Sequence, residues 1–262
     1  MTRVRLDQLL VDRALARSRA AAQALLLAGE VELAGAGSRT LKPGQLVDPE
    51  AQVSVIARRR WASRAGEKLD AALDAFAIDP AGRACLDAGS STGGFTDVLL
   101  DRGARIVYAV DVGRGQLLDR LARDPRVVSM ERTNLRTLRR LPEPIDLATL
   151  DLSFISLRLV LAAVRELLRD EGQVIALVKP QFEAGRDAVP RGGVVRDPAT
   201  HRAVLLQFCE DASGAGFSPA AVIGSPIVGA DGNREFLVLL SSGHEPRPGW
   251  FSQVDTVAPS PV

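Results

Sequence analysis

The sequence contains little cysteine and no long apolar run. Its two cysteines, Cys85 and Cys209, lie far apart and match no metal-ligand spacing, so we expect neither a disulfide framework nor a metal site. The longest apolar stretches, such as residues 159–164, are far shorter than the roughly 20 residues that a transmembrane helix needs. Residues 1–10 also lack the apolar core of a secretory signal peptide. We therefore expect a cytoplasmic protein with no membrane partner.

Lysine is the scarcest charged residue. Of the 33 basic residues only three are lysines, Lys42, Lys68 and Lys179, and the others are arginines. Arginine stays protonated in proteins, whereas lysine is a compact charge whose pKa falls readily on burial. Lys68 precedes a glycine-rich turn and Lys179 ends an apolar run, so both are candidates for chemistry that arginine cannot perform. The alternative is that a few lysines persist by chance.

Charge is unevenly distributed along the 262 residues. The first 66 residues carry eleven Lys and Arg against six Asp and Glu, whereas the whole chain has a net charge of only +1. A small basic N-terminal part on a mildly acidic remainder indicates an anionic partner such as nucleic acid. A basic surface without a ligand is the alternative.

The spacing of apolar residues in the N-terminal part predicts two short helices, over 6–15 and 19–28, followed by short strands. Ser18 is placed to cap the second helix, and Arg17, Arg19 and Gln23 would share its start and one face. An arginine-rich helix start suits RNA phosphates, but it equally suits a solvated surface.

The segment RLDQLLVDRALARSRAAAQALLLAGEVEL, followed by LKPGQLV, resembles the S4-type RNA-binding domain. The resemblance implies a small α+β domain over residues 1–57 that binds structured RNA, although this chain has LAGAG where that family usually has a V-N-G turn. We expect residues 58–66 (RRRWASRAG) to link this domain to the rest, either along nucleic acid or as a tether. The candidate RNA-binding residues are Arg5, Arg17, Arg19, Gln23, Arg58, Arg59 and Arg60.

Strand-like and helical segments alternate from residue 67 to residue 242. Apolar strands that alternate with helices predict an α/β fold with a mostly parallel, doubly wound sheet. The last two strands, 220–226 and 234–241, flank the turn GADGN and are expected to form an antiparallel hairpin. Residues 243–262 are rich in Pro, Gly and Ser, and we expect them to be a disordered tail.

The segment LDAGSSTGGFTDVLL carries the strongest single motif. A strand ends on Asp87, a glycine-rich turn follows, and the next strand ends about 20 residues later on Asp111, where nucleotide-binding sheets hold a ribose. The spacing differs from G-x-G-x-x-G, and a carboxylate at Asp87 would repel a pyrophosphate but suit the positive charges of S-adenosylmethionine. The pattern resembles the cofactor loop of class I S-adenosylmethionine-dependent methyltransferases, and a tight turn without a ligand is the alternative. The candidate cofactor-binding residues are Asp87, Gly89, Ser90, Ser91, Gly93, Gly94, Phe95, Asp111 and Asn134.

Four polar residues are expected at the same edge of the sheet, where open α/β sheets bind ligands. Asp151 and Lys179 end two predicted strands, Glu235 opens the last one, and Lys68 enters from the helix before the first strand. In order and context they resemble the K-D-K-E tetrad of the FtsJ-like 2′-O-methyltransferases, and with the N-terminal domain the chain resembles the TlyA-type family, some of whose members are labelled hemolysin. The resemblance implies S-adenosylmethionine-dependent methylation of a ribose 2′-OH, that of a cytidine, in ribosomal RNA or ribosomal subunits. It implies no DNA partner.

The chemistry and three other functions remain open at this point. A ribose 2′-OH is a very weak acid, so Lys179 would act either as a neutral base or as a charged stabiliser of the oxyanion. A non-catalytic RNA-binding factor would not need lysine rather than arginine, and a pore-forming toxin would need a spanning segment. Base methyltransferases tend to carry N/D-P-P-Y/F where this chain has DLSF. We also interpret residues 184–197 as a glycine-hinged flap that faces the substrate, with a plain connection as the alternative, and His201 as a surface or capping residue.

Overall fold

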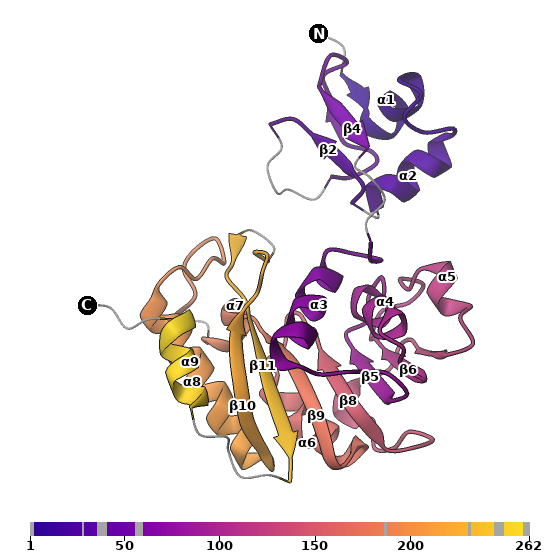
Figure 1. The fold of residues 1–262 in the computed structure, drawn as a ribbon. Coiled ribbons are helices and arrows are strands. Elements are labelled where there is room, and N and C mark those ends of the chain that lie inside the picture. The colour runs from indigo at the N-terminus through magenta and orange to yellow at the C-terminus, as the bar shows by residue number, and fades with distance from the viewer. Residues whose placement is uncertain are drawn as a thin grey trace. The chain divides into compact units, whose positions relative to one another are not determined.

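The computed structural model describes residues 3–27, 29–35, 41–55, 60–185, 188–229, 232–243 and 249–258. The chain divides into two compact units, Met1–Ser63 and Arg64–Val262, each with its own buried core (Figure 1). The division falls inside the segment 58–66 that the sequence analysis assigned to a link. The last two residues of that segment already belong to the helix that follows, which begins at Ala65.

The first unit is a small α+β structure. Its elements are β1 (Val4–Arg5), α1 (Leu6–Asp12), α2 (Arg19–Leu27), β2 (Val31–Leu33), β3 (Leu46–Val47) and β4 (Val53–Val55). Strand β1 pairs with β3 and β2 with β4, both antiparallel. The two predicted helices are present, and Ser18 Oγ accepts a hydrogen bond from the backbone N of Ala21 at 3.2 Å, as expected for a helix cap. Helix α1 ends at Asp12, because Ala14 takes a left-handed backbone conformation (φ 55°).

A seven-stranded sheet forms the centre of the second unit (Figure 1). Its order is β10-β11-β9-β8-β5-β6-β7. The strands are β5 (Ala84–Ala88), β6 (Ile106–Val110), β7 (Val127–Met130), β8 (Ile145–Leu150), β9 (Leu168–Val178), β10 (Phe217–Gly224) and β11 (Phe236–Ser242). Strands β5 to β9 are parallel, whereas β11 pairs antiparallel with both β9 and β10. The predicted mostly parallel sheet and its C-terminal hairpin are therefore confirmed.

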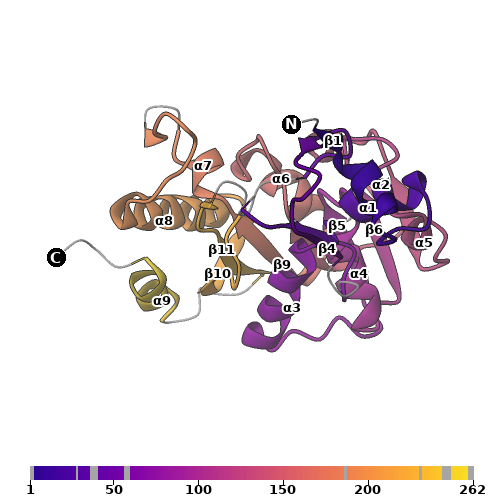
Figure 2. The same cartoon turned by 90° about the horizontal axis from the view of Figure 1, so that it is seen from above.

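Helices cover both faces of this sheet, which explains why its central strands are mostly apolar and buried. The helices are α3 (Ala65–Phe76), α4 (Gly94–Asp101), α5 (Asp119–Ala122), α6 (Arg158–Leu167), α7 (Pro180–Glu183), α8 (Pro198–Gly214) and α9 (Trp250–Val257). Seen from above, α3 and α4 lie on one side of the sheet and α6 and α8 on the other (Figure 2). Both cysteines are buried within this unit.

The expectation of a disordered tail after residue 242 is wrong for residues 249–258, which contain α9. Val254 on this helix is fully buried, and Gln253 Oε1 accepts a hydrogen bond from the backbone N of Val222 in β10 at 2.8 Å. Asp255 pairs with Arg202 of α8 at 2.7 Å. Trp250, Val254 and Val257 have helical spacing and give α9 an apolar face. This helix was not predicted because the Pro-rich composition of the segment indicated disorder.

Candidate active site

Two buried ion pairs hold the four predicted catalytic residues. Lys179 Nζ lies 2.6 Å from Asp151 Oδ1 and donates a hydrogen bond to Ser153 Oγ at 2.9 Å. Lys68 Nζ, from α3, lies 2.5 Å from Glu235 Oε2. Only 8% of Lys68 and 7% of Lys179 is exposed. Because an unpaired buried charge is costly, the two carboxylates make the burial of both lysines possible.

The sheet places both pairs at the same edge. Asp151 follows β8 and Lys179 follows β9, and these strands are parallel neighbours. Phe236 of β11 pairs with Val178 of β9, so the next residues in this antiparallel register are Glu235 and Lys179. Residues directly opposite each other on antiparallel strands have Cβ atoms about 5 Å apart. The two ion pairs are therefore neighbours.

Glu183, whose role was not predicted from the sequence, also stabilises this edge. It is the last residue of α7, and it accepts hydrogen bonds from Ser156 Oγ at 2.6 Å and from the backbone N of Leu157 at 2.8 Å. Burial raises the pKa of Glu183, and these two hydrogen bonds oppose the rise. Leu157 is the N-cap of α6, so one carboxylate joins the segment after β9 to the segment after β8. Its position in LVKPQFE, close to Lys179, was the available signal.

An exposed aromatic ring lies next to the ion pairs along the chain. Phe154 is 91% exposed and has a left-handed backbone (φ 64°), which costs a bulky residue on the order of 1–3 kcal/mol. Its ring centroid lies 5.2 Å from that of Phe182. A solvent-facing ring held in a strained conformation beside Ser153 is suited to stacking on a nucleobase.

The glycine-rich turn after β5 packs directly against the end of β8. A Cβ added to Gly89 would lie 2.5 Å from the backbone oxygen of Asp151, so only glycine fits there. Gly93 (φ 97°) packs equally closely against the side chains of Leu117 and Leu121. The turn therefore brings backbone close to Asp151, which places the predicted cofactor loop beside the ion pairs.

Asp111 ties this turn to the loop after β6. Its Oδ2 accepts a hydrogen bond from the backbone N of Ser91 at 2.9 Å, and its Oδ1 accepts one from the backbone N of Gly113 at 2.7 Å. An ionised carboxylate has about four lone-pair sites, so acceptor capacity remains for the hydroxyls of a ribose. The next residue, Val112, is 72% exposed and offers an apolar surface beside it. These residues fit a nucleoside.

Asp87 does not face the turn as predicted. Its carboxylate is fully buried and accepts a hydrogen bond from Thr96 Oγ1 at 2.6 Å, with Thr149 Oγ1 3.4 Å from its other oxygen. Burial raises the pKa of Asp87 to about 7, against the Thr96 hydrogen bond that lowers it. In this arrangement Asp87 supports the turn from the interior of the unit, and none of its atoms is exposed to a ligand.

The remaining predicted cofactor residues differ in their environments. Ser90 and Phe95 are buried, and Phe95 belongs to the interior of α4, which Gly94 begins. Ser91 is exposed and takes a left-handed backbone (φ 45°). Asn134 is exposed, and its side chain caps the short 3-10 helix η1 (Leu135–Thr137) by accepting from the backbone N of Arg136 at 3.0 Å. This capping explains asparagine at position 134 without a ligand.

The described part of the predicted flap is held in place by side chains of other elements. The backbone N of Val195 donates to Asn233 Oδ1 at 3.0 Å, and its backbone O lies 2.9 Å from His201 Nε2. Asn233 Nδ2 donates to the backbone O of Gly193 at 3.0 Å. The expectation that His201 is a surface or capping residue is wrong, since its ring is buried edge-on against Phe236.

Three predicted RNA-binding side chains of the first unit converge on one buried carboxylate. Asp7 accepts hydrogen bonds from Arg5 at 2.9 and 3.0 Å, from Arg19 Nε at 3.1 Å and from Gln23 at 3.0 Å. The hydrogen bonds from Arg5 are the main reason that the pKa of Asp7 is well below its usual range. Arg19 bonds Asp7 through Nε, which leaves its terminal nitrogens for other acceptors. Arg17 is exposed at the start of α2.

The other predicted RNA-binding residues belong to the segment between the units. The guanidinium of Arg60 lies over the ring of Trp61, 4.3 Å from its centroid. Arg58 and Arg59 lie outside the described residues. Among the residues that the structure does describe, no helix is long and apolar enough to cross a membrane.

Comparison with known proteins identifies the family. Residues 61–242 match the FtsJ-like methyltransferase family. The chain is 47% identical to the "16S/23S rRNA (cytidine-2'-O)-methyltransferase TlyA" of Mycobacterium tuberculosis, over 91% of this chain and 90% of that protein, and 38% identical to "Hemolysin A" of Brachyspira hyodysenteriae, over 89% and 98%. A hemolysin-named structure from Streptococcus thermophilus superposes with a TM-score of 0.77 at 40% identity and covers 98% of this chain and 95% of that one. The chain therefore belongs to the FtsJ-like methyltransferase family and is an S-adenosylmethionine-dependent enzyme.

Proposed function

We propose that this enzyme methylates the 2′-OH of a cytidine ribose in ribosomal RNA. The single observation that carries the proposal is the pair of buried ion pairs, Lys179–Asp151 and Lys68–Glu235, at the strand edge beside the glycine turn. The name of the Mycobacterium tuberculosis relative, which covers nine-tenths of both chains, supports the same substrate. The coarser activity, methyl transfer to ribosomal RNA, rests on several relatives named for it.

Lys179 is the residue placed to meet the reacting oxygen. A lysine ammonium has three hydrogens, and Ser153 Oγ accepts a hydrogen bond from one of them, while Asp151 Oδ1 lies at ion-pair distance, 2.6 Å, from the nitrogen. A further hydrogen is available for an oxygen that gains negative charge as the hydroxyl loses its proton. Asp151, the carboxylate that is ion-paired with Lys179, would accept this proton. Lys68 and Glu235 form the neighbouring pair, which fixes the start of β11 against α3.

The cofactor would lie along the edge formed by the glycine turn and the loop after β6. S-adenosylmethionine supplies an electrophilic methyl group on a positively charged sulfur. Gly89, Ser91 and Gly93 would hold it through close backbone approach, and Asp111 would accept hydrogen bonds from its ribose hydroxyls. Val112 would cover one face of the adenine, with Asn134 nearby in sequence order after β7.

The first unit would bind the RNA. We infer that residues 1–57 are an S4-type domain and that the exposed terminal groups of Arg5, Arg17 and Arg19 contact phosphates. Asp7 supports this role because it fixes the directions of the Arg5 and Arg19 side chains before RNA arrives. In the catalytic unit, Phe154 provides a stacking surface for a base near the reacting ribose.

The test is methyl transfer from radiolabelled S-adenosylmethionine to purified ribosomal subunits and to naked ribosomal RNA, with modified positions mapped by resistance to alkaline cleavage. We expect label at a cleavage-resistant cytidine. Label on RNA that remains alkali-sensitive would identify a base methyltransferase and overturn the 2′-O proposal. Binding of S-adenosylmethionine without transfer to either substrate would contradict an rRNA target.

A further inference from the structure

Three exposed arginines lie on two segments that follow or precede strand ends at the edge of the sheet that carries the ion pairs. Arg191 and Arg196 lie on the segment 188–197, which follows α7 and therefore the end of β9. Arg234 directly precedes Glu235, at the start of β11. Since the start of β11 pairs with the end of β9, both segments are at the edge that carries the ion pairs.

Asn233 joins the two segments into one surface. Its side chain bonds the backbone of Val195 and of Gly193, each at 3.0 Å, while its backbone O accepts from Gly229 N at 2.8 Å. Only 2% of Asn233 and 3% of Val195 is exposed, so these bonds are shielded from water. The arginines therefore extend from a backbone that is already ordered, and little entropy is lost when they bind a ligand.

These arginines are not engaged by carboxylates of the described residues, in contrast to many others in the same unit. Paired arginines elsewhere in the unit are Arg102, Arg105, Arg120, Arg123, Arg126, Arg139, Arg169 and Arg202. Asp197, which directly follows Arg196, is used as the cap of α8. It accepts from Thr200 N at 3.0 Å, from Thr200 Oγ1 at 2.7 Å and from Ala199 N at 3.2 Å.

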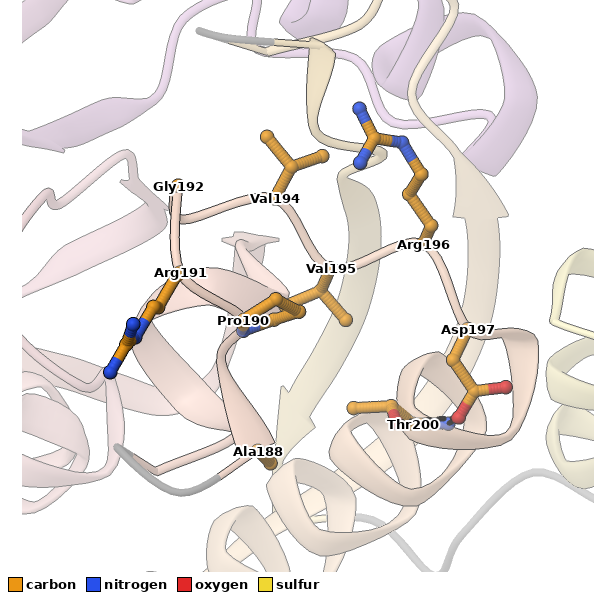
Figure 3. Close-up of a pocket in the computed structure, with 9 residues that line it drawn as sticks. All are labelled: Ala188, Pro190, Arg191, Gly192, Val194, Val195, Arg196, Asp197 and Thr200. Carbon is orange, nitrogen blue, oxygen red and sulfur yellow. Dashed lines mark hydrogen bonds between the residues drawn. The ribbon is translucent and has the colours of Figure 1, made fainter.

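Figure 3 shows how the segment presents its side chains. It borders an open pocket of about 450 Å³, which is lined by residues 190–192 and 194–197 together with Ala188 and Thr200. Arg191 and Arg196 extend in different directions from the segment. Two guanidinium groups that diverge in this way fit successive phosphates of a chain better than one small anion.

We propose that the segment 188–197 together with Arg234 forms a second RNA-binding surface, which grips the phosphate backbone next to the target nucleotide. The inference rests on the proposed function and names a further part of its substrate interface. Arginine is suited to this task because its planar guanidinium donates paired hydrogen bonds to phosphate oxygens. The surface would act beside the reaction edge, whereas the first unit contacts RNA through its own arginines.

The test compares two double variants that remove the same charge. Arg191→Ala/Arg196→Ala removes the proposed contacts, and Arg123→Ala/Arg139→Ala removes two exposed arginines that are paired with carboxylates (side chains 81% and 64% exposed). Methyl transfer to ribosomal subunits and to naked ribosomal RNA would be measured as a function of salt, with S-adenosylmethionine affinity and thermal unfolding of each variant.

We expect the first variant to raise KM for RNA about tenfold. The slope of the logarithm of the RNA binding constant against the logarithm of the salt concentration should fall by the equivalent of about one to two phosphate contacts. Its kcat, S-adenosylmethionine affinity and melting temperature should match the parent, and Arg191→Lys/Arg196→Lys should restore most of the RNA affinity. The second variant should change KM less than twofold. If both Ala variants behave alike while the parent is active, this inference is overturned and the proposed function stands. If the parent itself neither binds nor methylates ribosomal RNA, both fall.

Discussion

At the residue scale, Lys179 shows why a lysine persists in an arginine-rich chain. Its ammonium lies between Asp151 Oδ1 and Ser153 Oγ, and only 7% of the residue is exposed. A planar guanidinium is larger and points its N–H groups in different directions, so it would not fit the same two oxygens. We expect Lys179→Arg to fold and to bind S-adenosylmethionine while losing at least about 100-fold in kcat.

The matched control is Lys42→Arg, at the exposed lysine of the first unit, which should remain fully active. Single-turnover methyl transfer and calorimetric titration with S-adenosylmethionine would measure both quantities. Near-parental activity of Lys179→Arg would refute the special role of this lysine.

Asp87 makes stability depend on pH. Its pKa of about 7 in the fold exceeds the ordinary 3.8, so the folded state favours the protonated carboxyl. The resulting stabilisation is complete below about pH 4 and is lost as pH rises through 7. Asp87→Asn keeps the shape and stays neutral, so its free energy of unfolding relative to the parent should rise by about 2–3 kcal/mol between pH 5 and pH 8. Urea unfolding at both pH values measures this difference, and a pH-independent difference would contradict the assignment.

At the element scale, the Glu183 side chain ties α7 to the start of α6. The Glu183 carboxylate hydrogen-bonds the segment after β8, so it joins the segment that carries Lys179 to the one that carries Asp151. Leaving the two donors of this contact without their acceptor costs about 1–3 kcal/mol, which would favour displacement of the segment that carries Lys179. We therefore expect Glu183→Ala to lower kcat about 10- to 100-fold and Glu183→Gln to lower it less. The affinity for S-adenosylmethionine should change little.

The control for Glu183 is Glu166→Gln on α6, whose carboxylate is half exposed and lies 3.4 Å from Arg139. It should leave kcat unchanged. A parallel loss of kcat, cofactor affinity and melting temperature in Glu183→Gln would indicate a general structural defect and no positioning role.

At the scale of the whole molecule, two units with separate cores divide the work. Removal of residues 1–63, which ends at the boundary between the units, should leave the second unit folded and able to bind S-adenosylmethionine. RNA affinity should fall about 100-fold or more. Since Arg5, Arg17 and Arg19 are lost, the slope of log affinity against log salt concentration should fall by the equivalent of about two to three phosphate contacts. Fluorescence anisotropy with ribosomal RNA over a range of salt concentrations tests this, and equal binding by the truncated chain would show that the first unit is not the anchor.

Much of the fold was predictable because it is encoded in short-range patterns. Alternating apolar strands and amphipathic helices specified the parallel sheet, and the segments that carry Asp151 and Lys179 ended strands as expected. The helix α9 was missed because Pro and Gly around it dominate the composition, although Val254 and its neighbours have helical spacing. The burial of His201 was missed because a residue near a helix start can face either way, and only packing decides.

By itself, the sequence determined which residue types would gather at one edge of the sheet, since strand ends fix that edge whatever the packing. Only the tertiary structure decided how they pair. Lys68 and Glu235 are 167 residues apart in sequence, and nothing local predicts that they bond to each other while Lys179 takes Asp151. The tertiary structure likewise placed Asp87 inside the unit, where the Thr96 hydroxyl donates a hydrogen bond to it while burial raises its pKa. Periodicity is a property of neighbouring residues, whereas ion pairs and burial depend on contacts between distant parts of the chain.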